Sequence, residues 1–206
     1  MSGAMIELIR PILDKSFFYE AYHVLIGARY RSAILVTDYI RPKKTDRILD
    51  IGCGPGNMLP FLPDCDYVGV DSNEEYIAAA RRRYGHRGRF ICERVSHHDV
   101  NQLDSFDIVL ALGLVHHLND SEARDLFRVA FVALRAGGRL ITNDGCYTSS
   151  QSALERYLLS RDRGRFVRNQ EQYVELAHSC FAYVNPHLRR DVLRIPYTHL
   201  ILECTR

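Results

Sequence analysis

Short apolar runs alternate with longer amphipathic segments along most of the chain. The runs are four to eight residues long and rich in Val, Ile, Leu, Phe or Tyr, as buried strands are. Strands separated by helical segments indicate βα units and a parallel sheet. No crossover helix fits between the last two runs, so they are expected to pair as a hairpin around Pro196. The predicted strands are residues 47–51, 67–70, 90–95, 106–112, 139–142, 187–194 and 198–204.

The segments between these runs have helical spacing. The lead-in over residues 14–40 places Tyr22 and other apolar side chains on one helical face, and Pro42 marks its end. Ser72 and Glu75 fit a capping box at the start of a helix that Gly85 would stop. The remaining predicted helices are a short one after the glycines up to residue 62, then 121–135, 152–160 and 170–179.

The most informative motif is a glycine-rich turn directly after the first strand, Asp50-Ile51-Gly52-Cys53-Gly54-Pro55-Gly56-Asn57. Glycine allows the backbone to bend tightly and to lie against a ligand, and a helix starting after the turn would point its N–H groups at that ligand. Asp71 closes the next strand, where a carboxylate can accept from both ribose hydroxyls of an adenosine. The two features predict a nucleoside-containing ligand at the carboxyl ends of the strands.

The glycine spacing distinguishes between two kinds of nucleoside ligand. A dinucleotide fingerprint, G-x-G-x-x-G, has glycine where this chain has Asn57. The pattern D-x-G-x-G-x-G instead resembles motif I of class I S-adenosylmethionine-dependent methyltransferases. Later segments are similar to the same family: the acid and helix start at 70–76, the strand 106–112 with His116-His117-Leu118 after it, and the L-x-x-G-G-x-L turn at 134–140. The resemblance implies S-adenosyl-L-methionine as cofactor and methyl transfer to an acceptor.

The resemblance also implies which residues hold the cofactor. Tyr76 would pack on the adenine, although it could equally be an ordinary apolar helix position. Arg94 stands where the family often has an acid that accepts from the adenine amino group; arginine cannot accept, so the Val95 backbone or a nearby acid would take that place. The predicted cofactor-binding residues are Asp50, Gly52, Cys53, Gly54, Gly56, Asp71, Ser72, Tyr76, Val95 and Leu112.

These elements together predict one α/β domain over residues 1–206. The expected fold is a Rossmann-like, seven-stranded and mostly parallel sheet with an antiparallel last strand and helices on both faces. Residues 1–42 would form an N-terminal helical segment, which the resemblance implies is a lid, and residues 43–206 the core. A chain of this length has room for a substantial single core.

His116 and His117 are the predicted catalytic residues, because they follow the fourth strand at the ligand-binding edge. An acceptor that is protonated at neutral pH needs a base, and the pKa of histidine suits that role. The alternative is that they orient the loop through hydrogen bonds. No metal ligands are predicted, since the six cysteines are scattered without a C-x-x-C pair.

Polar residues after the fifth strand are expected to form a loop that lines the acceptor pocket: Asn143, Asp144, Cys146, Tyr147 and Gln151. Cys146 lacks the Pro-Cys setting of RNA cytosine methyltransferases, so it is not predicted to be a nucleophile. In the N-terminal helices, Tyr22 or Arg29 could meet the carboxylate of the cofactor.

Four arginines fall within residues 161–168. They could clamp a carboxylate or phosphate on an acceptor. The other interpretation is a solvated turn between two helices, partly neutralised by nearby acids, and it is favoured because surface basic runs are common.

Composition narrows the choice of partner. The chain has 27 basic and 25 acidic residues, a net charge of +2, so no global field indicates nucleic acid or an anionic membrane. A small-molecule methyl acceptor in a biosynthetic pathway is therefore expected, without membrane or nucleic acid as partner. Without a secretory signal, the cysteines suggest reduced thiols in a cytoplasmic protein. The alternatives are an RNA or protein methyltransferase docking through residues 161–168, and a non-catalytic protein that binds S-adenosylmethionine.

Overall fold

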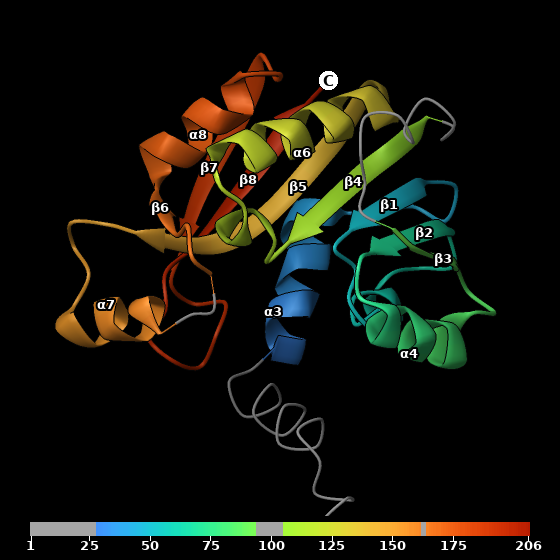
Figure 1. Ribbon diagram of the computed structural model, residues 1–206, viewed down its shortest axis with the longest axis horizontal. Helices are drawn as coiled ribbons and strands as arrows, with labels where there is room; N and C mark the ends of the chain where they lie inside the picture. Colours follow the sequence, from blue (N-terminus) through green and yellow to red (C-terminus); the bar gives the residue numbers. More distant parts are fainter. Residues whose placement is uncertain (1–27, 94–104, 162–163) are drawn as a thin grey trace, which may run out of the picture.

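The computed structural model describes residues 28–93, 105–161 and 164–206. Its centre is a mixed sheet with the strand order β3-β2-β1-β4-β5-β8-β7 and the short β6 beside β5 (Figure 1). The strands are β1 (Arg47–Ile51), β2 (Asp66–Asp71), β3 (Arg89–Cys92), β4 (Phe106–Leu112), β5 (Leu134–Tyr147), β6 (Arg168–Asn169), β7 (Tyr183–Arg189) and β8 (His199–Thr205).

Strand direction follows the prediction. The first five strands pair in parallel, whereas β8 runs antiparallel to both β5 and β7. The Rossmann-like α/β architecture with an antiparallel last strand is therefore confirmed. One strand was missed: β6 has only two residues, too few to produce an alternating pattern, and it exists because it pairs with Cys146 and Tyr147 of β5.

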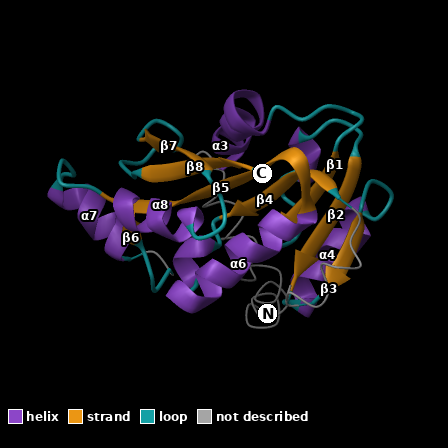
Figure 2. Cartoon of the chain, turned by 90° about the horizontal axis from the view of Figure 1, so that it is seen from above, coloured by secondary structure: helices purple, strands orange, loops and turns teal. Residues whose placement is uncertain are grey.

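Helices cover both faces of the sheet (Figure 2). One face packs against α6 (Asp120–Ala133) and α8 (Gln170–His178) through buried residues such as Phe127 and Tyr173. The other packs against α4 (Glu74–Tyr84) and η1, a π-helical turn at Leu35–Ile40 that continues α3 (Ala28–Ile34). The remaining elements are α7 (Ala153–Ser160) and the 3₁₀ turns η2 (Leu59–Phe61) and η3 (Val115–His117).

Several boundaries differ from the predictions at helix ends. The cap of α4 is Asn73, whose side chain accepts from the Tyr76 N–H, and not Ser72. The helix expected after the glycine turn is only η2, because Pro60 and Pro63 leave too few N–H donors for a longer one. Helix α6 ends at Ala133, two residues early, because Leu134 already has extended backbone and pairs with Phe106.

The late strands also differ. β5 extends to Tyr147, so four of the five residues expected in a loop belong to the strand, and only Gln151 lies beyond it. β8 pairs along β5 as far as Gly145, and this tertiary pairing overrides the turn preference of Asn143 and Asp144. β7 begins at Tyr183, four residues before its predicted start. It contains Pro186, which reads as a strand breaker but is tolerated because β7 lies at an edge of the sheet.

Candidate functional site

The glycine turn connects β1 to η2 at the carboxyl ends of the parallel strands. Gly52, Gly54 and Gly56 all have positive φ, 75°, 54° and 78°, a region that other residues rarely adopt. The Gly52 N–H donates to the Val70 carbonyl of β2 at 2.8 Å, which fixes the turn against the sheet. A Cβ on Gly54 would meet no described atom within 4 Å, so this part of the backbone faces open space. The turn is a bare cradle of the kind that a ligand can approach.

Asp71 is joined to this turn directly. Its Oδ2 accepts from the Gly54 N–H at 2.9 Å, and its Oδ1 accepts from the Asn73 N–H at 2.8 Å. Each carboxylate oxygen keeps a further lone pair after accepting one bond. The structure thus brings together the two predicted elements, the glycine turn and the acid.

Asp50 lies in β1, two residues before Gly52. It is only 2% exposed, and its Oδ2 accepts a 2.7 Å hydrogen bond from the Tyr67 hydroxyl. Burial raises the pKa of the Asp50 carboxyl to about 7; the Tyr67 hydrogen bond opposes this and the nearby Asp71 charge adds to it. Asp50 is therefore a buried carboxyl in β1, directly before the turn, that is held by Tyr67 of β2.

Of the other predicted cofactor residues, some are exposed beside Asp71, one is buried and one lies outside the described residues. Ser72 and Tyr76 are exposed before and within the first turn of α4, next to Asp71. The Cys53 side chain is buried against Gly69, where burial raises its pKa well above the ordinary value, so only its backbone remains for a ligand. Val95 and Arg94, like Tyr22, lie outside the described residues, and the adenine contact stays a prediction.

The ends of β4 and β5 form the next part of the site. Leu112 is half-buried and in register with Asn143, and the Gly113 N–H donates to the Asn143 carbonyl at 2.8 Å. The Asn143 side chain is 2% exposed, and its Oδ1 has no hydrogen-bond partner among the described residues. A buried acceptor without a donor suits a ligand N–H. With the bare Gly54 backbone and the Asp71 carboxylate, these residues fit a nucleoside that carries an amino acid.

His116 and His117 lie in η3, immediately beyond β4, with ring centroids 4.3 Å apart. His116 is 6% exposed, and its Nδ1 lies 2.7 Å from Oδ1 of Asp144. The same oxygen accepts from the His116 backbone N–H at 3.2 Å. The His117 side chain is exposed. Sequence reasoning named the histidines but missed this pairing, because Asp144 was expected in a loop and lies inside β5.

The residues beyond Asp144 do not form the predicted loop. Cys146 is buried in β5, and burial raises the pKa of its thiol to about 12, in agreement with the prediction that it is not a nucleophile. The Gln151 side chain donates to the Cys146 carbonyl and accepts from the Thr148 N–H, so it closes the turn before α7. Among the described cysteines, all six are free thiols.

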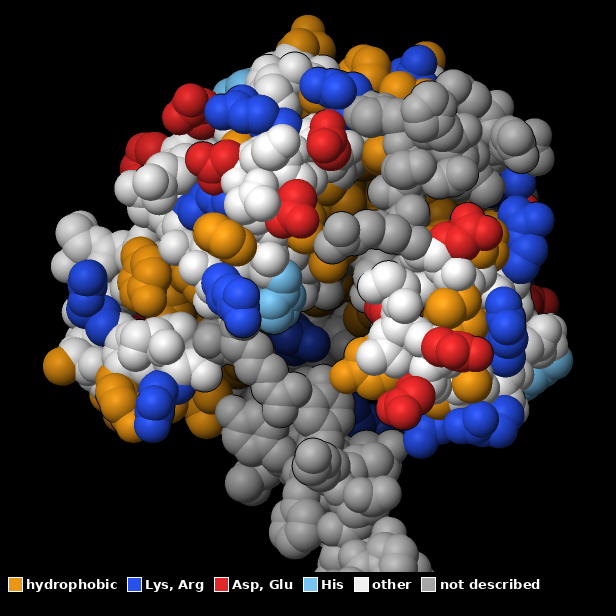
Figure 3. All heavy atoms as spheres, viewed as in Figure 1, with side chains coloured by type: hydrophobic (Ala, Val, Ile, Leu, Met, Phe, Trp, Pro, Cys, Tyr) orange, Lys and Arg blue, Asp and Glu red, His pale blue; other side chains and the backbone are white. Residues whose placement is uncertain are grey.

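The space-filling view shows a recess in this face of the molecule, between α4 and the side that carries α7 (Figure 3). In Figure 1 the arrowheads of β2 and β4 point toward α3 at the same place. Within the described ranges, no group of three or more His, Cys, Asp or Glu side chains could hold a metal ion. The helices of those ranges also include none with the length and apolar character to cross a membrane.

Comparison with known proteins agrees with this geometry. Residues 48–138, from β1 to the start of β5, match the profile of the family described as methyltransferase domain. In this segment the chain is similar to methyltransferase domains. The match begins with the strand that leads into the glycine turn and includes Asp71 and both histidines. The resemblance found in the sequence is thereby confirmed.

Individual relatives of this methyltransferase domain differ in what their names say they act on. The chain is 26% identical over 130 residues to the tRNA (carboxymethyluridine(34)-5-O)-methyltransferase of Saccharomyces cerevisiae, covering 62% of this chain and 45% of that enzyme. It is 32% identical over 117 residues to the 27-O-demethylrifamycin SV methyltransferase of Amycolatopsis mediterranei, covering 53% and 42%. The chain thus spans less than half the length of these two curated relatives.

Among solved structures, the plantazolicin methyltransferase BamL in complex with triazolic desmethylPZN analog and SAH superimposes with a TM-score of 0.64. The alignment covers 92% of this chain and 89% of that chain at 17% identity. At this identity the likeness shows the fold, which therefore extends beyond the matched domain to the C-terminal strands.

Proposed function

We propose that the protein transfers a methyl group from S-adenosylmethionine to a hydroxyl group of a small molecule. The observation that carries the proposal is the coincidence, at one sheet edge, of the Gly54–Asp71 cradle with a histidine–carboxylate pair. The glycine turn with Asp71 suits binding of the cofactor, and the histidine–carboxylate pair suits removal of a proton from the acceptor.

Three groups of this chain would hold the cofactor. The Asp71 carboxylate would accept from the ribose hydroxyls, and the glycine backbone from Gly52 to Gly56 would lie along the sugar and the amino acid. The orphaned Asn143 Oδ1 supports a place for the ammonium group, since it is a buried acceptor without a donor. Bound S-adenosylmethionine supplies an electrophilic methyl on a sulfonium, so the protein needs chiefly to orient the acceptor and remove its proton.

His116 is the proposed base. With Nδ1–H donating to Asp144, the imidazole is held in the tautomer whose Nε2 can take a proton. In the transfer, the acceptor oxygen bonds to the methyl carbon as the carbon–sulfur bond breaks, and the hydroxyl proton passes to Nε2. A base of this kind contributes about 10²–10⁴-fold to the rate. An amine or an already ionised acceptor would need it less, and so the pair favours a hydroxyl.

The choice of a small molecule rests on charge and on the kinds of relatives. The chain carries a net charge of only +2, whereas binding of RNA depends on clustered positive charge. The relative from Amycolatopsis is named for a small-molecule acceptor. The relative from yeast is named for tRNA, so RNA is the alternative that the assay must include.

The test has a binding arm and a transfer arm. Calorimetry with S-adenosylmethionine and S-adenosylhomocysteine should show binding of both. Tritiated cofactor should then label catechol or another simple phenol in a panel that includes unfractionated tRNA. Binding of neither cofactor form would refute the whole proposal, labelling of tRNA alone would refute the small-molecule class, and binding without transfer to any probe would favour a non-catalytic protein.

Substitutions in the histidine–carboxylate pair test which residue acts as the base. His116→Gln and Asp144→Asn should each lower kcat about 10²-fold or more, with little change in the Kd of the cofactor. His86→Gln, which alters an exposed histidine after α4, is the matched control. A loss confined to His117→Gln would transfer the role of base to the exposed histidine and contradict the proposed geometry.

A further inference from the structure

The arginine-rich segment at residues 161–168 contains both exposed and buried arginines in its described part. Arg168, the last of the four arginines, is only 7% exposed, so it is neither solvated nor directed at an acceptor. The preference for a solvated turn is wrong at this position. Arg165 and Arg161 are exposed, and Arg161 stacks over Tyr157 with its guanidinium carbon 5.7 Å from the ring centroid.

Each of the five N–H bonds of the Arg168 guanidinium corresponds to one hydrogen bond in the structure. Nε and Nη2 donate to Oδ1 of Asp120 at 3.0 and 2.7 Å. Nη1 donates to the Phe166 carbonyl at 2.9 Å and to the Val115 carbonyl at 3.3 Å. Nη2 also donates to the Leu118 carbonyl at 2.8 Å. The guanidinium therefore brackets His116 and His117 by binding the residue on either side of them.

Two further contacts hold the backbone of His116 itself. The Phe166 N–H donates to the His116 carbonyl at 2.9 Å, and Asp144 accepts from the His116 N–H. The backbone carbonyls of residues 115, 116 and 118 are thus all bound by residues 166–168, and the N–H of residue 116 is bound by β5. Groups from outside the loop therefore hold the backbone at residues 115, 116 and 118.

Gly164 completes this arrangement at the edge of the imidazole. A Cβ at position 164 would overlap Cδ2 of His116, and a Cβ at Gly113 would lie 3.9 Å from Cε1. Nε2 is the ring atom between these two carbons. The chain at Gly164 packs against the Cδ2–Cγ edge of the ring, at a distance that only glycine permits.

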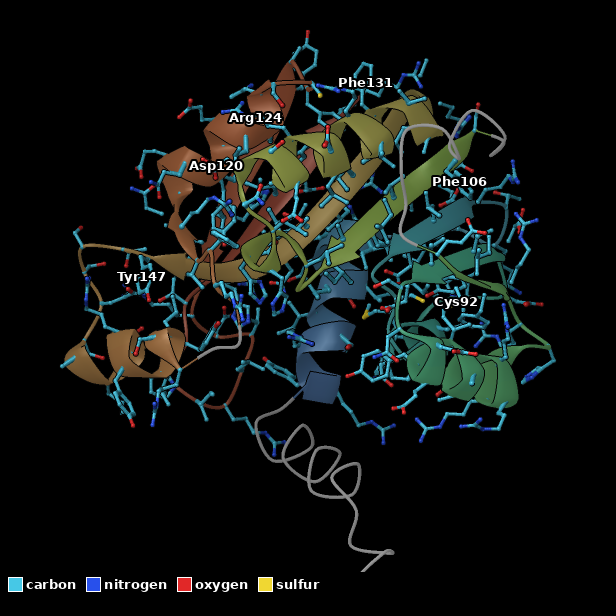
Figure 4. All side chains as sticks on the ribbon, in the orientation of Figure 1. Cys92, Phe106, Asp120, Arg124, Phe131 and Tyr147 are labelled. Atoms are coloured by element: carbon cyan, nitrogen blue, oxygen red, sulfur yellow. The ribbon has the colours of Figure 1, made fainter. Side chains whose placement is uncertain are left out.

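Burial of Arg168 is expensive for the fold. Moving a charged side chain out of water is unfavourable unless it is paired. The partner of Arg168, Asp120, lies at the start of α6 and its side chain is 71% exposed (Figure 4). The pairing with Asp120 alone would anchor α6. The guanidinium also binds three backbone carbonyls, and two of them, Val115 and Leu118, flank the histidines. These contacts indicate that Arg168 fixes the histidine loop as well as α6.

We propose that Arg168 is a positioning residue for methyl transfer: its five-bonded guanidinium, with the strap of residues 164–167, sets the place and orientation of His116. The inference rests on the proposed function, because it takes His116 as the base. Arg168 touches neither cofactor nor acceptor in this proposal, and it acts through the loop. Both groups are tied to β5: Asp144 belongs to this strand, and Arg168 in β6 pairs with Cys146, two residues further along it.

The test uses Arg168→Lys, which keeps the charge but offers three donors on a point charge in place of a planar fork of five. The imidazole signals of His116, assigned with His116→Gln, are followed by ¹⁵N NMR as pH is varied. We expect the variant to lose the single tautomer and to change the titration midpoint of His116. With catechol as acceptor, kcat should fall about 10–100-fold while the Kd of S-adenosylhomocysteine stays within about twofold.

The matched control is Arg124→Lys on α6, a half-buried arginine one turn beyond Asp120 that lies 4.0 Å from Glu175 (Figure 4). It should leave the His116 signals and kcat unchanged. Should Arg168→Lys unfold, Gly164→Ala is the second variant, since it retains the guanidinium but displaces the ring, and the same NMR change is expected from it.

The outcomes separate the two proposals. Unchanged His116 tautomer and titration in folded Arg168→Lys overturn the positioning role, even if the variant is less stable. A wild-type protein that binds cofactor but leaves catechol and the other probes unmethylated counts against the proposed function, and the NMR comparison then decides the positioning role alone.

Discussion

Replacing Asp50 by Asn should stabilise the protein at neutral and alkaline pH but not at acid pH. In the folded protein the Asp50 carboxyl has its pKa raised from 3.8 to about 7 by burial. In the unfolded chain the same group ionises near the ordinary value. Between these two values the folded protein holds a proton that the unfolded chain has released.

The sign and size follow from this difference. A raised pKa in the folded state contributes stability that is fully present below about pH 4 and is lost as pH rises toward 7. Each pH unit in that window costs about 1.4 kcal/mol, so between pH 5 and pH 7 ionisation of Asp50 should cost about 3 kcal/mol. Asparagine does not titrate, and its amide oxygen can still accept the hydrogen bond from Tyr67.

The assay is urea unfolding of wild type and Asp50→Asn without cofactor, at pH 5, 6, 7 and 8. The difference between the two proteins cancels the titration of all other groups. The free energy of unfolding of Asp50→Asn, relative to that of wild type, should rise by about 3 kcal/mol from pH 5 to pH 8. A difference that stays constant over this range would show that Asp50 is ionised in the folded protein throughout, and would refute the account of a desolvated carboxyl before the turn.

Three further predictions concern the same edge of the sheet. Asp71→Ala should weaken S-adenosylhomocysteine binding about tenfold or more in calorimetry, since the ribose and the Gly54 N–H both lose their acceptor, and an unchanged Kd would count against the cradle. Gly56→Ala should lower the free energy of unfolding by more than Gly54→Ala, because both have positive φ but only the Gly56 Cβ would meet side chains, at 3.0 Å; equal losses would contradict the packing. Maleimide at pH 7 should label exposed Cys92 in the native protein but not Cys146, whose pKa burial raises to about 12, and rapid labelling of Cys146 would contradict its burial.

Local features of the chain were the ones that its sequence could predict. Strands β1 and β4 have the predicted bounds, because short apolar runs between polar turns leave little choice of register. The glycine turn and Asp71 were predicted as one site, since parallel strands end at a common edge. Even the departures there are local: Asn73 caps α4 in place of Ser72, one residue away.

Contacts between distant residues were not predictable in the same way. Asp144 and His116 are 28 positions apart, and their meeting depends on β5 continuing past Asn143, which happens only because β8 pairs alongside it. Arg168 is 48 positions from Asp120, and its sequence neighbourhood of charges reads as solvated surface. Propensity describes a residue and its neighbours, whereas burial and pairing depend on what the rest of the chain brings to that place.

The sequence by itself determined the α/β class, the parallel order of the first strands and the nucleoside-binding edge, because backbone sterics at glycine and apolar periodicity act within a few residues. Only the tertiary structure decided which histidine faces a carboxylate, which arginine is buried and where β5 and β7 run. Those outcomes depend on the free energy of desolvating a group and of finding it a partner, and the partner comes from another part of the chain.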